Sequence, residues 1–321
     1  MNRYRLRQIV LITSLFLSVS VTIFLFIRAG TGTVSGTGSE ESGPDRHIIT
    51  PVDLPGKLYF AGEGVPLENF DVRESLDMEL LINKYWQSHS LLLIKRANRH
   101  FPVIEKVLSE NDMPDDLKYL AVAESDLTNL TSPSDAVGYW QFLEGTAREL
   151  GLEVNDEVDE RYHLEKSTEA ACKFLRQSYE IYGSWTTAAA SYNAGRTGIN
   201  KQIERQGTKY YYDLLLNGET GRYIYRVLAL KLILSDPAAY GFEVKERDLY
   251  PAIPTYEVTL DTPVEDFAAL SERYSINYKI LKYFNPWLRE TYLSNPDRKV
   301  YYIRIPVNGY RSFNQEAQPA D

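Results

Sequence analysis

Apolar residues recur every three or four positions over much of the chain, and this spacing predicts a mainly helical region. Helices are expected over residues 76–99, 101–109, 113–125, 138–150, 168–182, 185–191 and 222–235. Gly, Pro and short polar runs separate them, and no alternating strand pattern occurs between residues 56 and 245. Residues 56–250 are therefore expected to form one helical domain.

The segment after residue 253 has a different pattern. Strand, helix, helix and strand are expected in that order, over residues 255–260, 262–274, 277–284 and 299–305. Thr262 and Glu265 have the spacing of a capping box, which predicts that Thr262 caps the first of these helices. Residues 254–308 are thus expected to form a small α+β module, followed by a short tail over residues 309–321.

The N-terminal segment is strongly apolar. Ile9–Ile27 contains no charged residue, and three arginines precede it. This pattern predicts a membrane anchor within residues 1–29, with the rest of the chain outside the cytoplasm, in the cell envelope. Ile27-Arg28-Ala29 is a poor cleavage site, so an uncleaved anchor is favoured over a cleaved signal peptide. Residues 30–55, rich in Gly, Ser and Thr and then Pro, are expected to be a flexible linker.

Composition narrows the possible partners. The net charge of −9 argues against nucleic acid, which requires concentrated Lys and Arg, but allows a polymer of largely neutral sugars. The single cysteine, Cys172, permits no intramolecular disulfide, and the four His have no metal-ligand spacing. No metal and no other cofactor is expected.

Glu124 is the candidate catalytic residue. Asp112 is expected to cap its helix and Pro114 to occupy the first turn. The positions at helical spacing along this helix form one stripe: Leu117, Leu120, Ala121 and Glu124. Burial and the negative end of the helix dipole both raise the pKa of such a carboxyl, which suits it to donate a proton in glycosidic bond cleavage. A core glutamate paired with a neighbouring helix is the alternative.

Four short motifs extend this interpretation. In chain order they are Glu124-Ser125, Gly138-Tyr-Trp-Gln141, Ser191-Tyr-Asn-Ala-Gly195 and Glu219-Thr-Gly-Arg-Tyr223. Each is weak alone, but together they have the order and spacing found in family 1 lytic murein transglycosylases. The chain resembles this family, particularly its membrane-bound type D members, from about residue 58 to 241.

The resemblance implies a lysozyme-like helical fold and a peptidoglycan substrate. Such enzymes cleave the β-1,4 bond between N-acetylmuramic acid and N-acetylglucosamine and leave a 1,6-anhydromuramyl product. Glu124 is then the single general acid and base, supported by Ser125. Three residues are expected to line the saccharide subsites: Gln141, Tyr192 and Asn193.

The resemblance gives separate roles to the residues of the last motif. Tyr223 is expected to hydrogen-bond to Glu124, whereas Glu219 is expected to anchor the start of its helix. Asp126 points away from the Glu124 face by helical spacing and is left out of the site. Asp135 and Glu144 depart from the family pattern, which often has Gly and Pro at these positions.

The C-terminal module resembles a LysM peptidoglycan-binding module, although Leu260-Asp-Thr-Pro263 replaces the usual Gly-Asp-Thr-Leu. Two other functions fit the same residues. A muramidase of goose-lysozyme type would share the fold and the acid but use water as nucleophile. A non-catalytic peptidoglycan-binding scaffold would use neither.

Overall fold

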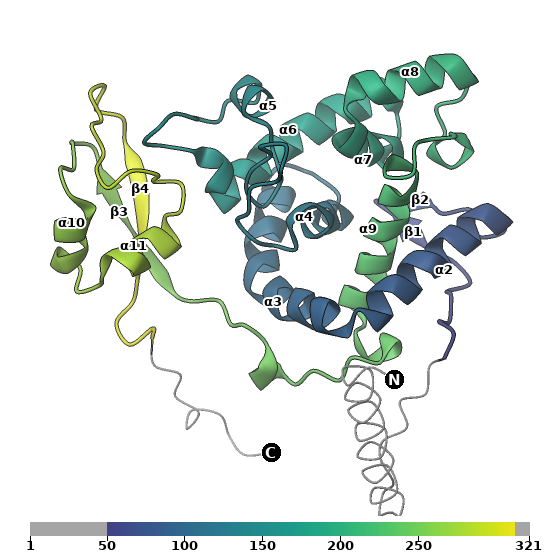
Figure 1. Cartoon of the computed structure of the whole chain (residues 1–321), viewed down its shortest axis with the longest axis horizontal. Coiled ribbons are helices and arrows are strands. Elements are labelled where there is room, and N and C mark those ends of the chain that lie inside the picture. The colour runs from purple at the N-terminus through teal and green to yellow at the C-terminus, as the bar shows by residue number, and fades with distance from the viewer. Residues whose placement is uncertain (1–49, 312–321) are drawn as a thin grey trace, which may run out of the picture. The chain divides into compact units, whose positions relative to one another are not determined.

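Helix α4 (Lys118–Ser125) lies among longer helices in the computed structural model, which describes residues 50–311 (Figure 1). It packs against α3 (Gln87–Glu110) and α9 (Thr220–Ser235). The remaining helices of this region are α2 (Phe70–Tyr85), α5 (Glu144–Glu149), α6 (Leu164–Tyr182), α7 (Trp185–Ala194) and α8 (Arg196–Gln206). The predicted mainly helical fold is confirmed.

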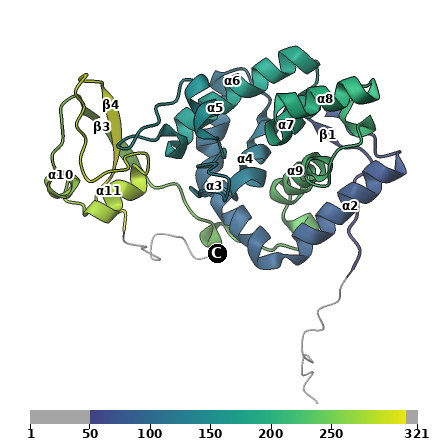
Figure 2. The same cartoon turned by 45° about the horizontal axis from the view of Figure 1, so that its top comes forward.

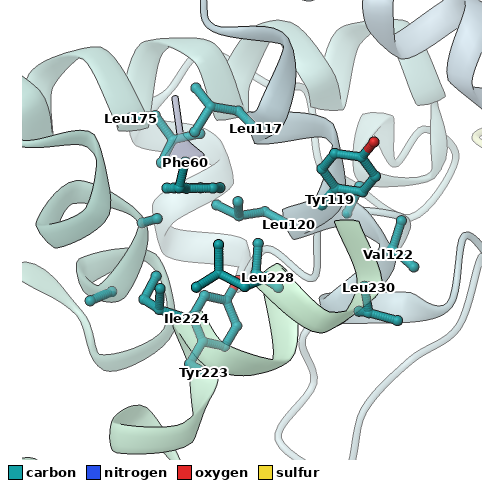
Figure 3. Packing of buried hydrophobic residues seen from close by; sticks show 14 of the residues in the cluster. Phe60, Leu117, Tyr119, Leu120, Val122, Leu175, Tyr223, Ile224, Leu228 and Leu230 are labelled. Atoms are coloured by element: carbon teal, nitrogen blue, oxygen red, sulfur yellow. The ribbon is translucent and has the colours of Figure 1, made fainter. Parts of the chain in front are cut away.

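The core forms where α4 faces α9. Figure 3 shows Leu120 close to Leu228 and Ile224, and all three side chains are fully buried. Burying a leucine side chain contributes about 1.5–3 kcal/mol, so this contact fixes α4 firmly against α9. The turned view in Figure 2 also places α4 between α3 and α9.

A short hairpin precedes the helices and is missing from the prediction. Strands β1 (Tyr59–Phe60) and β2 (Glu63–Gly64) pair antiparallel, each too short to show an alternating pattern. Phe60 is fully buried in the helical core. Asp116 accepts hydrogen bonds from the Ala61 backbone N–H and from Lys231, each at 2.7 Å, and so joins the hairpin to α9.

Several predicted helix boundaries are wrong. The break between α2 and α3 falls at Trp86, not near residue 100, and Pro102 lies inside α3. The chain turns at Trp86 because α2 packs on α9, whereas α3 packs on α6 and α4. Local sequence patterns do not reveal this difference in packing partners. Asp112 is not a cap: it has a positive φ of 50°, and a 3₁₀ turn (Asp115–Leu117) precedes α4.

The Gly138 motif forms a turn rather than a helix, and α5 begins only at Glu144. Gly138 has a φ of 83°, and a Cβ there would lie 2.0 Å from the Arg161 carbonyl oxygen. Only glycine fits so close an approach of two backbone segments. Asp135 also has a positive φ, of 61°.

The C-terminal module has the predicted element order. Strands β3 (Thr255–Leu260) and β4 (Tyr301–Pro306) pair antiparallel, with α10 (Phe267–Arg273) and α11 (Tyr278–Phe284) between them in the chain. The cap of α10 is Asp266, not Thr262, because the Asp266 side chain accepts the Ala268 N–H at 2.7 Å. The module has a hydrophobic core of its own, to which Val158 also contributes.

The predicted anchor over residues 1–29 and most of the predicted linker lie outside the described residues. Within residues 50–311, no helix combines the length and apolar character needed to cross a membrane. Most of the expected tail, residues 312–321, is likewise outside the description.

Candidate active site

Glu124 lies near the end of α4, with its side chain partly buried. The Tyr223 hydroxyl donates a hydrogen bond of 2.6 Å to its Oε1, so the expected contact is present. Burial raises the pKa of Glu124 to about 7, and the nearby Glu219 charge acts in the same direction, against the opposing effects of Tyr223 and Arg226. About half of these carboxyls therefore carry a proton at neutral pH, as a general acid requires.

Ser125 holds the adjacent turn rather than the Glu124 carboxyl. Its side chain is buried, and Oγ lies 2.8 Å from the Tyr139 carbonyl oxygen and 3.1 Å from that of Ala121. The first contact joins the end of α4 to the turn over residues 138–142. Ser125 thus supports Glu124 through the backbone around it.

Gln141 uses its amide within the same turn. Nε2 donates hydrogen bonds to the carbonyl oxygens of Gly138, at 2.8 Å, and Leu130, at 3.1 Å. Its φ is 49°, so the backbone is in the left-handed region that Gly favours. The side chain is partly exposed, and its role toward a saccharide stays a prediction.

Tyr192 and Asn193 lie at the end of α7, next to both α9 and the turn. The Tyr192 hydroxyl donates to the Trp140 carbonyl oxygen at 2.7 Å, and the Thr220 hydroxyl donates to Asn193 Oδ1 at 3.1 Å. Burial raises the pKa of Tyr192, and the charge of Glu124 raises it further, which places Tyr192 close to Glu124. The structure therefore brings all the predicted site residues into one region.

Two family models match this chain. Residues 101–215 match the model of the transglycosylase SLT domain, and residues 256–309 match that of the soluble lytic transglycosylase C-terminal LysM-like domain. The chain carries an SLT domain and a LysM-like domain. The SLT match contains Glu124, Gln141, Tyr192 and Asn193, and Tyr223 lies just beyond its end.

Two curated relatives have the same name, membrane-bound lytic murein transglycosylase D. They come from Escherichia coli K12 and from Escherichia coli O6:H1 strain CFT073. Each is 29% identical over 270 residues, which cover 80% of this chain and 57% of the relative. The chain thus spans little more than half the length of these relatives.

The start of α7 in the SLT domain is held by a residue that the sequence did not single out. Glu63 of the hairpin accepts hydrogen bonds from Ser184 Oγ at 2.8 Å, and from the Thr186 N–H at 3.0 Å and Oγ1 at 2.7 Å. A carboxylate at a helix N-terminus satisfies free N–H groups and complements the dipole. Glu63 therefore fixes the helix that ends in Tyr192 and Asn193, and only the tertiary fold brings it there.

The start of α9 is held by a second unpredicted glutamate. Glu79 of α2 is 1% exposed, and its Oε1 lies 2.6 Å from Arg222 Nε. Arg222 directly precedes Tyr223, so this ion pair sets the position of the residue that contacts Glu124. The motif Glu219-Thr-Gly-Arg-Tyr223 contains Arg222, but the sequence alone does not identify Glu79 as its partner.

Glu219 does not anchor its helix, contrary to the prediction. The Asn217 side chain accepts the N–H groups of Glu219, at 3.1 Å, and Thr220, at 2.8 Å. The Glu219 side chain makes no capping hydrogen bond and is exposed. Asn217 performs the anchoring because its short amide side chain reaches the free N–H groups of the first turn. The remaining effect of Glu219 is on the pKa of Glu124.

Proposed function

We propose that the protein is a peptidoglycan lytic transglycosylase in which Glu124 is the single general acid and base. The observation that supports this most is a partly buried carboxyl of the SLT region that has a pKa of about 7 and accepts a hydrogen bond from Tyr223. The names of the relatives point to the same substrate, murein. The bond cut is the β-1,4 linkage between N-acetylmuramic acid and N-acetylglucosamine.

The first step uses the protonated form of Glu124. Its proton passes to the glycosidic oxygen as the bond from that oxygen to the muramyl C1 breaks, and N-acetylglucosamine leaves with a new hydroxyl. The positive charge that develops at C1 is stabilised by the carbonyl oxygen of the muramyl N-acetyl group. Glu124 is left as a carboxylate, to which the Tyr223 hydroxyl donates.

The second step uses that carboxylate as a base. The muramyl C6 hydroxyl attacks C1 and gives its proton to Glu124, which closes the 1,6-anhydro ring and displaces the N-acetyl oxygen. No water is consumed, and Glu124 returns to its initial state. A glycan without the muramyl N-acetyl group is expected to be cut far more slowly, and rates on matched substrates measure this.

A hydrolase is the second candidate, and the proximity of Glu219 favours it. The Glu219 charge acts on Glu124, so a second carboxylate lies within electrostatic reach of the acid. Glycosidases that use two carboxylates activate water or form a covalent intermediate with the second one. In that case Glu219→Gln abolishes activity, whereas in the transglycosylase it only lowers the pKa of Glu124.

We also propose the cell wall as the place of action. The apolar N-terminal segment and the membrane-bound relatives support an anchored protein with its SLT domain in the periplasm. The LysM-like domain is proposed to bind glycan as well. Sedimentation of Glu124→Gln protein with sacculi, with and without residues 254–321, tests this binding without digestion.

Purified Glu124→Gln tests the catalytic role. We expect it to release soluble muropeptides from sacculi at least about a thousandfold more slowly than wild type, because acid and base are both lost. Gln has nearly the same shape and can still accept the Tyr223 hydrogen bond, so the fold is retained. Circular dichroism verifies this, and a folded variant that digests sacculi normally would refute the proposal.

A further inference from the structure

Trp86 is a large aromatic residue that the proposed chemistry does not use. It forms the joint between α2 and α3, with φ −86° and ψ 59°, and 57% of it is exposed. It belongs to neither hydrophobic core of the described residues. Its ring is therefore accessible from solvent.

The ring is held in one orientation from below. The His89 ring stacks on it with centroids 3.9 Å apart and planes 12° from parallel. His89 Nε2 in turn lies 3.0 Å from Asp126 Oδ1, and Arg96 donates to the Asp126 carbonyl oxygen at 3.1 Å. One face of the indole is therefore covered and the other is left to solvent, as a rigid flat surface.

This surface is linked to the end of α4, the helix that carries Glu124. Asp126, which His89 contacts, is two residues after Glu124 at the end of α4. Helix α2 also packs on α9: Glu79 contacts Arg222, and Ser75 contacts Tyr225. Glu79 contacts the first turn of α9, and Trp86 follows seven residues later, where α2 joins α3. The charge of Glu219, directly before that turn of α9, acts on Glu124.

We propose that the free face of Trp86 binds one pyranose unit of the glycan strand, at a subsite away from the bond that is cut. This rests on the proposed function, which supplies a long saccharide that passes Glu124. Pyranose rings present apolar C–H groups on their faces, and these pack against the electron-rich face of an indole. Asp126, whose side chain is 43% exposed, offers a carboxylate beside the platform for sugar hydroxyls.

The main competing occupant is a protein that covers the apolar side of α2. Met78, Ile82 and Trp86 follow one another at helical spacing and are 39%, 42% and 57% exposed. The stacked His89 and its link to Asp126 favour the saccharide, because they rigidify only Trp86 and tie it to the Glu124 helix. Ile82→Gln separates the two, since a protein contact depends on Ile82 whereas stacking does not.

Steady-state cleavage of peptide-free glycan strands of graded length is the first test. We expect Trp86→Ala to raise KM for long strands about tenfold with little change in kcat, while Trp86→Phe retains most of the affinity. Short fragments that end before the subsite are cut as by wild type. Phe70→Ala is the matched control, because Phe70 is 76% exposed at the far end of the same helix.

Two outcomes for Trp86→Ala overturn the subsite. One is a wild-type KM of Trp86→Ala for every strand length. The other is an equal loss in kcat at all lengths, which indicates a structural role. If Ile82→Gln is as impaired as Trp86→Ala on these protein-free substrates, the platform is not specific to the indole, and the proposal fails as well.

A binding measurement separates this inference from the proposed function. Tryptophan emission of Glu124→Gln is titrated with a peptide-free octasaccharide of alternating N-acetylglucosamine and N-acetylmuramic acid, so that no turnover is needed. We expect a saturable change that is absent from Glu124→Gln/Trp86→Phe, because phenylalanine keeps the stacking surface but lacks the indole emission. The same emission change and the same Kd in both variants would overturn the subsite. Wild-type protein that binds the octasaccharide but never cleaves it would refute only the proposed enzymatic function.

Discussion

Two glutamates of the helical domain, Glu124 and Glu79, are held by residues that adjoin in α9. Glu79 is almost fully buried and faces the Arg222 guanidinium at 2.6 Å. Glu124 is partly buried and faces the Tyr223 hydroxyl at 2.6 Å. One carboxylate thus has a permanent positive charge as its partner, and the other has a neutral phenol.

The first turn of α9 therefore has two roles: Arg222 fixes the packing of α2, and Tyr223 contacts the proposed catalytic carboxyl. A guanidinium offers a buried carboxylate an opposite charge and a short hydrogen bond, so Glu79 is suited to fix α2 against α9. A phenol stabilises the charge only through one hydrogen bond, so burial keeps the pKa of Glu124 at about 7. The arrangement around Glu124 allows a proton to move at neutral pH.

Among the substitutions around these two glutamates, removing Arg222 is expected to lower the unfolding free energy most. Arg222→Ala leaves Glu79 buried without a counter-charge, which costs about 3–5 kcal/mol of unfolding free energy. Glu79→Gln costs less, because the Arg222 side chain is 42% exposed and water can solvate it. Urea denaturation of both variants measures the asymmetry, and equal costs would contradict this account of the pair.

The stability of Glu124→Gln relative to wild type is expected to depend on pH. The pKa of Glu124 is raised from 4.5 to about 7, so the folded state binds more protons than the unfolded state between these values. Wild-type stability from this group is full below pH 4.5 and falls as pH rises to 7. Gln does not titrate, so its unfolding free energy has no such loss. The unfolding free energy of Glu124→Gln relative to wild type is therefore expected to be about 2–3 kcal/mol higher at pH 8 than at pH 4.

Thermal unfolding of both proteins at the two pH values checks this sign. A stability difference that does not change with pH would show that the Glu124 carboxyl is ordinary and solvated. Asp248→Asn is a suitable control, because Asp248 lies in an exposed 3₁₀ turn (Glu246–Asp248) with no buried residue. It is expected to leave the difference from wild type nearly constant.

Substitutions around Glu124 are expected to have smaller effects, and they shift the pH profile in opposite directions. Tyr223→Phe removes a hydrogen bond that stabilises the carboxylate, worth about 1 kcal/mol, so the pKa of Glu124 rises. The alkaline fall in kcat/KM then moves to higher pH. Glu219→Gln removes a negative charge that raises the pKa, so the fall moves to lower pH.

Profiles of kcat/KM against pH for these two variants give the shifts. Activity is required for both measurements, so an inactive Glu219→Gln would favour the two-carboxylate hydrolase. Shifts in the same direction would contradict the electrostatic assignment of Glu124.

Local pattern was enough to place Glu124 but not its surroundings. Its spacing from Leu117 and Leu120 predicts a buried carboxyl near a helix end, and the structure has it near the end of α4, partly buried. Periodicity reports which face of a helix is apolar and says nothing about which polar side chains meet across the fold. Glu79 and Glu63 were therefore missed, since their partners lie more than a hundred residues away in the chain.

The errors in helix boundaries have the same origin. The break at Trp86 carries no Gly or Pro, and α3 continues through Pro102, so the local signals were misleading at both positions. Packing of α2 on α9 and of α3 on α6 decides where the chain turns. The C-terminal module was easier to predict, because its strands and short helices alternate with clear turn residues.

The most direct test of the central claim is mass spectrometry of the muropeptides that wild-type protein releases from purified sacculi. If Glu124 is the single acid and base and the muramyl C6 hydroxyl attacks C1, the products carry 1,6-anhydromuramyl ends. These ends are lighter by one water than reducing ends. Reducing ends from wild-type protein, absent with Glu124→Gln, would show that water is the nucleophile and would contradict the account.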